Sequence, residues 1–213
     1  MSNYSSNNTN SWINLTFKSE RVRNTIDAWL KFGTVFFIYR LCTYFFFDRE
    51  KPDAKFFEGD SLKLVLFILL GFTVYFLFIH PYIPINSQHP VLRNLGNDML
   101  MFGTVLITSH LLESWASGGK VFNKDWLKVA GIILLSFATY DIVVAPFIPY
   151  DGMKPSIAPI VRDWAKYGTF LIVFRLLMGG SLLNKEWILS VLFVLLGFTG
   201  YQLITKKIIG VHA

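Results

Sequence analysis

The chain has 213 residues, of which 53% are hydrophobic and 17% aromatic, and its formal net charge is +6 at pH 7. This apolar share exceeds the roughly 45–50% of an ordinary soluble domain, and it comes in long blocks, which is typical of membrane-spanning helices. The basic residues stand at block ends rather than in one run. That distribution favours anionic lipid head groups, and not nucleic acid, as the partner of the positive charge.

Residues 1–26 are predicted to form a polar tail and then a basic, amphipathic juxtamembrane lead. The start is rich in Asn and Ser and lacks the basic region and short apolar core of a cleaved secretory signal. Asn3, Asn7 and Asn14 each begin a glycosylation sequon, which would be used only if this end faced a secretory lumen. Residues 12–23 mix apolar and basic side chains, as in an interfacial helix or a plain lead to the first span.

Six apolar blocks follow, each near the roughly 20 residues that cross a hydrocarbon core. We expect a membrane domain over residues 27–209, with spans at 27–47, 61–84, 98–116, 126–149, 163–180 and 187–209. Clusters of Pro, Gly and charged residues between the blocks mark turns and loops. The sequence therefore predicts an all-α integral membrane protein with six transmembrane helices.

Two motifs recur along the chain. In the odd-numbered blocks a glycine precedes a basic residue by seven positions, in the pairs Gly33 and Arg40, Gly103 and His110, and Gly168 and Arg175. In the even-numbered blocks a small residue precedes a tyrosine by four positions, in the pairs Gly71 and Tyr75, Ser136 and Tyr140, and Gly197 and Tyr201. Such recurrence predicts three tandem repeats, at residues 27–84, 98–149 and 163–209.

Each repeat holds two spans, so every copy enters the membrane from the same side. Parallel copies of this kind are related by an axis along the membrane normal. We therefore expect three helical hairpins in a pseudo-threefold bundle, with both termini on one side of the membrane. A small excess of Lys and Arg on that side favours a cytoplasmic location for both ends.

The repeated basic position forms the first candidate site. Ionisable side chains inside a bilayer are costly and usually mark function, and three of them around an axis would form a positive layer of Arg40, His110 and Arg175. A seven-residue offset is about two helical turns, so each shares a face with its glycine, where helices can approach closely. The alternatives are that Arg40 extends to the head groups, or that Glu113 pairs with Arg40 or Arg175.

Asp141 is the other charged residue inside a span, and Phe76 and Gln202 take its position in the other repeats. The repeat therefore does not require an acid there. A proton-coupled role for Asp141 would need a partner group, and local hydrogen bonding or a place near the interface explains the residue as well.

The second motif is interpreted as packing. Small residues allow helices to approach, and tyrosines four positions later on the same face suit the interfacial belt. We expect Gly71, Ser136 and Gly197, with Tyr75, Tyr140 and Tyr201, to be contact positions between helices and not a ligand site.

Catalytic signatures are missing from the sequence. It contains no His-Glu-x-x-His, no Gly-x-Ser-x-Gly, no phosphate-binding glycine loop, and no evident pair of intramembrane aspartates. His80, His89 and His212 have no ligand spacing, and Cys42 is the single cysteine. Neither an enzyme, a metal site nor a cofactor is expected.

Two hypotheses remain. The first is a structural or assembly role in a membrane, with lipid and either other proteins or copies of the same chain as partners. The internal membrane beneath the capsid of a large DNA virus is one setting that would suit it. The alternative is a small channel or transporter for anions or solutes that uses the layer of Arg40, His110 and Arg175.

Overall fold

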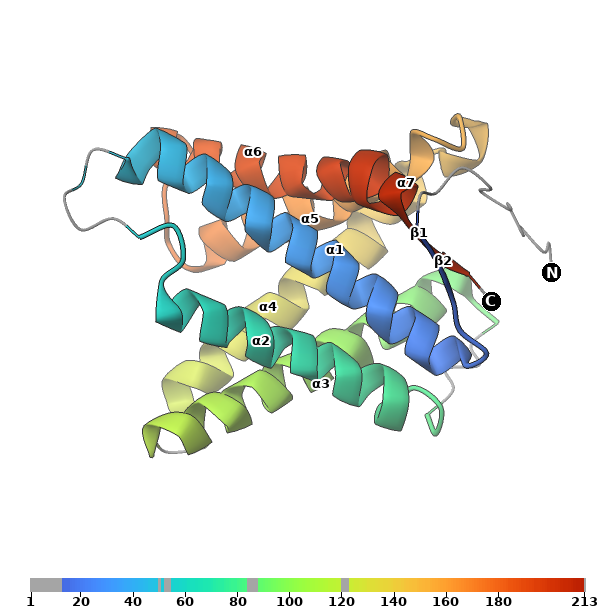
Figure 1. The fold of residues 1–213 in the computed structure, drawn as a ribbon, viewed down its shortest axis with the longest axis horizontal. Coiled ribbons are helices and arrows are strands. Elements are labelled where there is room, and N and C mark those ends of the chain that lie inside the picture. Colours follow the sequence, from blue (N-terminus) through green and yellow to red (C-terminus); the bar gives the residue numbers. More distant parts are fainter. Residues whose placement is uncertain (1–12, 50, 52–54, 84–87, 120–122, 213) are drawn as a thin grey trace.

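The computed structural model describes residues 13–49, 51, 55–83, 88–119 and 123–212. Within these ranges six long helices run side by side in one bundle (Figure 1). They are α1 (Glu20–Thr43), α2 (Gly59–Val74), α3 (Pro90–Ser117), α4 (Lys124–Thr139), α5 (Ala158–Leu177) and α6 (Lys185–Gly200). The all-α class and the six predicted helices are confirmed, and the helix α1 begins earlier than the predicted span because part of the basic lead is helical.

Short π-helical turns continue four of the helices. They are η1 (Tyr44–Asp48), η2 (Tyr75–Ile79), η3 (Tyr140–Val144) and η6 (Tyr201–Thr205), followed by the short helices η4 (Ala145–Phe147), η5 (Tyr150–Gly152) and α7 (Lys206–Ile208). The tyrosines of the second sequence motif each open one of these turns. A π turn inserts a residue into the helical ladder, so the faces of the residues beyond it cannot be assigned from the α-helical period.

Two short strands join segments from opposite ends of the chain. Strand β1 (Ile13–Thr16) pairs in parallel with β2 (Ile209–His212), with Ile13 opposite Ile209. No strand was predicted here, because the pairing depends on a partner far away in the sequence and not on a local pattern. The two strands lie together at one end of the bundle (Figure 1).

Two asparagine side chains and the backbone conformation of one glycine explain three helix boundaries. The Asn123 side chain accepts a hydrogen bond from the backbone N–H of Trp126 at 2.7 Å, and Asn184 accepts one from Trp187 at 3.0 Å. These are N-caps of α4 and α6. Gly118, with φ of 67°, occupies the left-handed conformation that ends α3.

The bundle is closed. Each long helix packs against the next in sequence, and α6 packs against α1. The closest approaches lie at two glycines: a Cβ at Gly71 would stand 2.8 Å from Cα of Val105, and a Cβ at Gly197 would stand 2.7 Å from Cα of Val35. Glycine is therefore required for α2 to lie against α3 and for α6 to lie against α1.

The glycines of the first motif have no such neighbour. A Cβ at any of the three would meet no heavy atom within 4 Å among the described residues; they are Gly33, Gly103 and Gly168. Close helix approach was expected at these three glycines, but the structure shows it at Gly71 and Gly197 of the second motif. A glycine seven residues before a basic residue therefore shares its helix face with that residue but is not a point of contact between helices.

Four helices, with their short continuations, are long and apolar enough to cross a membrane: Glu20–Asp48, Gly59–Ile79, Lys124–Phe147 and Lys185–Ile208. They indicate an integral multi-pass membrane protein in contact with a lipid bilayer. The helices α3 and α5 fall outside this set. In α5 the apolar sequence is interrupted by charges, which are Arg162, Asp163, Lys166 and Arg175.

Candidate functional site

An aromatic core fills the middle of the bundle, and every long helix contributes one ring to it. Face-to-face pairs form between Phe32 and Phe72, Phe102 and Phe137, and Tyr167 and Phe198, with centroids 4.4, 3.7 and 4.0 Å apart. Edge-to-face contacts at 6.0 to 6.4 Å join one pair to the next. These parallel and edge-to-face contacts connect rings from all six long helices into one continuous aromatic core.

An ionic cluster of Lys31, Asp98, Asp163 and Lys166 lies against the aromatic core. Lys31 Nζ is 2.5 Å from Asp163 Oδ1, and Lys166 Nζ pairs with Asp98 Oδ2. Each lysine directly precedes a core ring in sequence, Phe32 or Tyr167, but its ammonium lies over rings that other helices contribute. Because both aspartates are buried, these ion pairs compensate charges that would otherwise be very costly.

The lysines also lie over aromatic faces. Lys31 Nζ is 5.4 Å from the centroid of the Phe198 ring, and Lys166 Nζ is 5.4 Å from that of Phe102. A cation at this distance is attracted by the negative face of the ring. The aromatic core and the ionic cluster therefore stabilise each other, and both lysine positions are fixed from two sides.

Side chains at the ends of α1 and α6 complete the polar region. Gln202 Nε2 donates to Asp163 Oδ2 at 2.8 Å, so both oxygens of Asp163 are bound. The Tyr201 hydroxyl donates to Asp27 Oδ1. A cavity of about 230 Å³ opens among these groups, and Asn24, Asp27, Lys31, Asp163 and Lys166 are its polar lining.

Asp141 lies at the far side of the ionic cluster. Its side chain is 3% exposed, and its polar neighbour is the Asp98 carboxyl. Asp141 Oδ2 is buried with no hydrogen-bond donor among the described residues. The spacing in the sequence does not pair Asp141 with another aspartate, whereas in the fold η3, which carries Asp141, packs against α3, which carries Asp98.

The predicted basic layer has local contacts. Arg40 is buried and donates to the backbone oxygens of Lys55 at 3.1 Å and Phe56 at 3.2 Å, and its guanidinium is 3.9 Å from Asp48. It thus holds the connection between α1 and α2. The snorkelling alternative agrees with this direction, since the partners of Arg40 lie at the end of α1.

His110 and Arg175 also contact neighbouring segments. The His110 ring stacks on Trp126 at the start of α4, with centroids 4.5 Å apart. Arg175 Nε donates to the backbone oxygen of Ser181 at 3.3 Å, in the connection after α5. His110 thus contacts the first turn of the next helix, and Arg175 contacts the connection that follows its own helix. Neither contact joins one basic residue of the layer to another.

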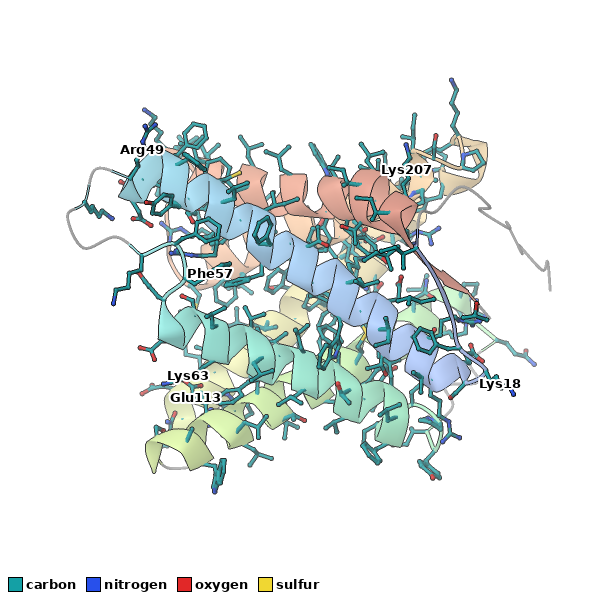
Figure 2. All side chains as sticks on the ribbon, viewed as in Figure 1. Lys18, Arg49, Phe57, Lys63, Glu113 and Lys207 are labelled. Atoms are coloured by element: carbon teal, nitrogen blue, oxygen red, sulfur yellow. The ribbon has the colours of Figure 1, made fainter. Side chains whose placement is uncertain are left out.

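Glu113 lies away from Arg40. It lines a cavity of about 330 Å³ between α2 and α3 together with Asp60 and Lys63, and Figure 2 shows Glu113 beside Lys63. The expected pairing of Glu113 with an arginine of the layer is not among the contacts of the described residues. The polar groups that converge in the bundle are those of the ionic cluster.

Comparison with protein-family models, curated proteins and solved structures finds no match to this chain. Within the described ranges, no group of three or more His, Cys, Asp or Glu side chains is arranged to hold a metal ion.

The ionic cluster was missed in the sequence because its members stand near the predicted span ends. In the sequence, Lys31 and Lys166 bear only on the membrane orientation, as two of the basic residues on the side of the termini. A signal was present: both lie two positions before the first-motif glycine, and Asp98 and Asp163 both lie five positions before it. Aligning the repeats at every charged position would have placed these four residues at one level of the bundle.

Proposed function

We propose that the protein is a non-enzymatic structural component of a membrane, a six-span body built from three tandem helical hairpins around a pseudo-threefold axis. The aromatic core is the observation that carries this proposal. Rings from all six long helices pack against one another along the middle of the bundle, where a conduction path would have to run. A body filled in this way is suited to mechanical support.

Support for three equivalent hairpins comes from contacts that recur at matching motif positions. Gly71 packs on Val105 and Gly197 packs on Val35, and in both cases a second-motif glycine meets the residue two positions after a first-motif glycine. Each hairpin also contributes one stacked ring pair. A duplicated unit that buries its faces against its copies would produce these recurrences.

A hydrogen bond inside the hairpins recurs in the same way. Trp29 Nε1 donates to Thr73 Oγ1 at 3.0 Å, and Trp164 Nε1 donates to Thr199 Oγ1 at 2.9 Å. The middle hairpin has Met99 at the tryptophan position. In the first and third hairpins, these tryptophans thus hydrogen-bond the first helix to the second.

The outer surface supports a body surrounded by lipid or by protein partners. Every long helix exposes large apolar side chains, including α3 and α5; examples are Phe37, Leu64, Ile107, Leu135, Ile172 and Leu196. Exposed apolar surface on all sides is expected of helices in a bilayer and of contacts with neighbouring membrane proteins. A protein layer such as the internal membrane of a large DNA virus capsid would use such a surface.

Reconstitution in liposomes tests this function against the transport alternative. We expect chloride and small-solute flux no faster than in protein-free liposomes, because the aromatic core closes the bundle. The alternative expects flux that is lost when Arg40→Ala and Arg175→Ala are combined. The matched control removes two exposed lysines instead, with Lys63→Ala and Lys185→Ala. Flux in the wild type and the control, but not in the arginine variant, would overturn the structural role.

A further inference from the structure

We propose that Asp98 and Asp141 form a proton-binding site, in which the two carboxyl groups share one proton inside the bundle. The pair is contributed by two elements, since Asp98 lies in α3 and Asp141 lies in the π turn η3. This site is independent of the structural role and would be present whether or not the protein conducts.

One carboxyl oxygen of Asp141, Oδ2, is buried and lacks a hydrogen-bond donor in the described part of the bundle. Helix α3, which carries Asp98, packs against η3, and the Asp98 carboxyl and the Lys166 ammonium are both near Asp141. An ionised carboxylate can only accept hydrogen bonds, whereas a protonated carboxyl can donate one. A hydrogen bond between the two aspartates therefore requires a proton on one of them.

The third hairpin holds the same contact with an amide in place of the acid. Gln202 follows Tyr201 as Asp141 follows Tyr140, and Asp163 precedes Gly168 by the same five positions by which Asp98 precedes Gly103. There the Gln202 amide donates to Asp163 at 2.8 Å. Asp141 holds the position that Gln202 holds in the third hairpin. A protonated Asp141 carboxyl can donate a hydrogen bond to Asp98, as the Gln202 amide donates one to Asp163.

The charge balance favours the same proton. Lys166 of α5 is the cation that faces both aspartates, so two ionised carboxylates would leave one buried negative charge. A shared proton makes the trio neutral, which avoids the large cost of an unpaired buried charge. The other titratable groups near the pair are Tyr75 of η2, Tyr140 of η3, and Asp163 and Tyr167 of α5.

Infrared spectroscopy of the full-length protein in lipid nanodiscs tests the site. We expect the C=O stretch of a protonated carboxyl in the wild type at pH 7, shifted in D₂O and lost at higher pH. Asp141→Asn should lose the band, because the asparagine amide donates to Asp98 without a proton. The control Asp60→Asn, which removes an exposed carboxyl, should keep it.

Stability gives a second readout. If the folded protein holds one more proton than the unfolded chain at neutral pH, the unfolding constant rises about tenfold per pH unit while that proton is held only in the folded state. The thermal midpoint of the wild type should fall as the pH rises above 7, and that of Asp141→Asn should change less. Asp98→Asn, whose amide can donate to Asp141, is the second variant should Asp141→Asn fail to fold.

Three results would overturn the site. One is a wild-type spectrum without the band at pH 7. Another is a band that survives in both Asp141→Asn and Asp98→Asn. The third is a band removed at constant pH by added sodium chloride but kept in choline chloride, since the pair would then bind a metal cation in preference to a proton.

Discussion

At the scale of single residues, glycine determines how near the helices lie. Gly197 has the Val35 backbone 2.7 Å from the position of a Cβ, and the nearest atom is a backbone atom that no rotamer change can move away. Gly33 has open space at the same position. The two glycines are both helical, so they differ in surroundings and not in backbone conformation.

Gly197→Ala is expected to lower the free energy of unfolding by about 1–3 kcal/mol, because α6 must move away from α1. Gly33→Ala is the matched control and should leave stability unchanged or raise it by up to about 1 kcal/mol, since alanine favours the helix. Reversible unfolding in mixed micelles, followed by circular dichroism, measures both. Equal destabilisation by the two substitutions would contradict the packing described for Gly197.

Gly71→Ala repeats this experiment between α2 and α3. If the hairpins are equivalent, its cost should match that of Gly197→Ala, because the Cβ would approach Val105 as closely as the other approaches Val35. This comparison measures the proposed pseudo-threefold arrangement directly, through two substitutions at one motif position.

At the scale of the elements, Arg40 fixes the connection that follows α1. Its guanidinium donates to two backbone oxygens, at Lys55 and Phe56, while Arg175 makes a single 3.3 Å bond in the corresponding connection after α5. The two arginines occupy the same motif position. They therefore allow a test in which the residue type is constant and the burial differs.

Arg40→Ala should make trypsin cleave after Lys55 about tenfold faster or more, because charge-assisted hydrogen bonds to this segment are lost. Arg175→Ala is the control, and it should leave this cleavage rate unchanged. Digestion in detergent followed by mass spectrometry gives the rate. An unchanged rate in Arg40→Ala would mean that these hydrogen bonds do not hold the connection.

The helices could be predicted from the sequence more readily than the turns that end them. Long apolar blocks and the Asn123 and Asn184 caps indicate where helices lie. The π turns at Tyr75, Tyr140 and Tyr201 were not predicted, since an inserted residue leaves no mark in the local pattern. The sequence therefore could not place Asp141 near Asp98, because the π turn decides which side of the helix Asp141 lies on.

At the scale of the whole molecule, six long helices and four apolar candidate spans predict different membrane topologies. In a six-span protein, Gln88 and Ser156 lie on one side and Lys55 on the other. If only the four apolar candidate spans crossed, Ser156 would share the side of Lys55, because α3 and α5 would not return the chain. One residue therefore distinguishes the two arrangements.

Single cysteines at these three positions, in a Cys42→Ser background, measure it. We expect a membrane-impermeant maleimide added to sealed proteoliposomes of one orientation to label Gln88→Cys and Ser156→Cys together, and Lys55→Cys only after the vesicles are opened, or the reverse. Labelling of Ser156→Cys together with Lys55→Cys would contradict six spans.

Long-range contacts explain what the sequence could not provide for the site. Lys31 and Asp163 are 132 residues apart, and their side chains can pair because α6 packs against both α1 and α5. The recurring motifs predict which residues hold equivalent positions, but they do not state which copies touch. The basic layer is a candidate in the sequence because a basic residue recurs in all three repeats, whereas the charges that converge in the fold come from positions that match in only two repeats.

The pairing of β1 with β2 has a consequence for the order of assembly during synthesis. Residues 13–16 leave the ribosome well before residues 209–212, so the first strand has no partner until all six long helices have been made. The surface of α1 around Val35 likewise has no packing partner until Gly197 of α6 has been synthesised. Closure of the ring is then the last event of biogenesis, and a ribosome stalled before α6 would leave both surfaces open to membrane chaperones.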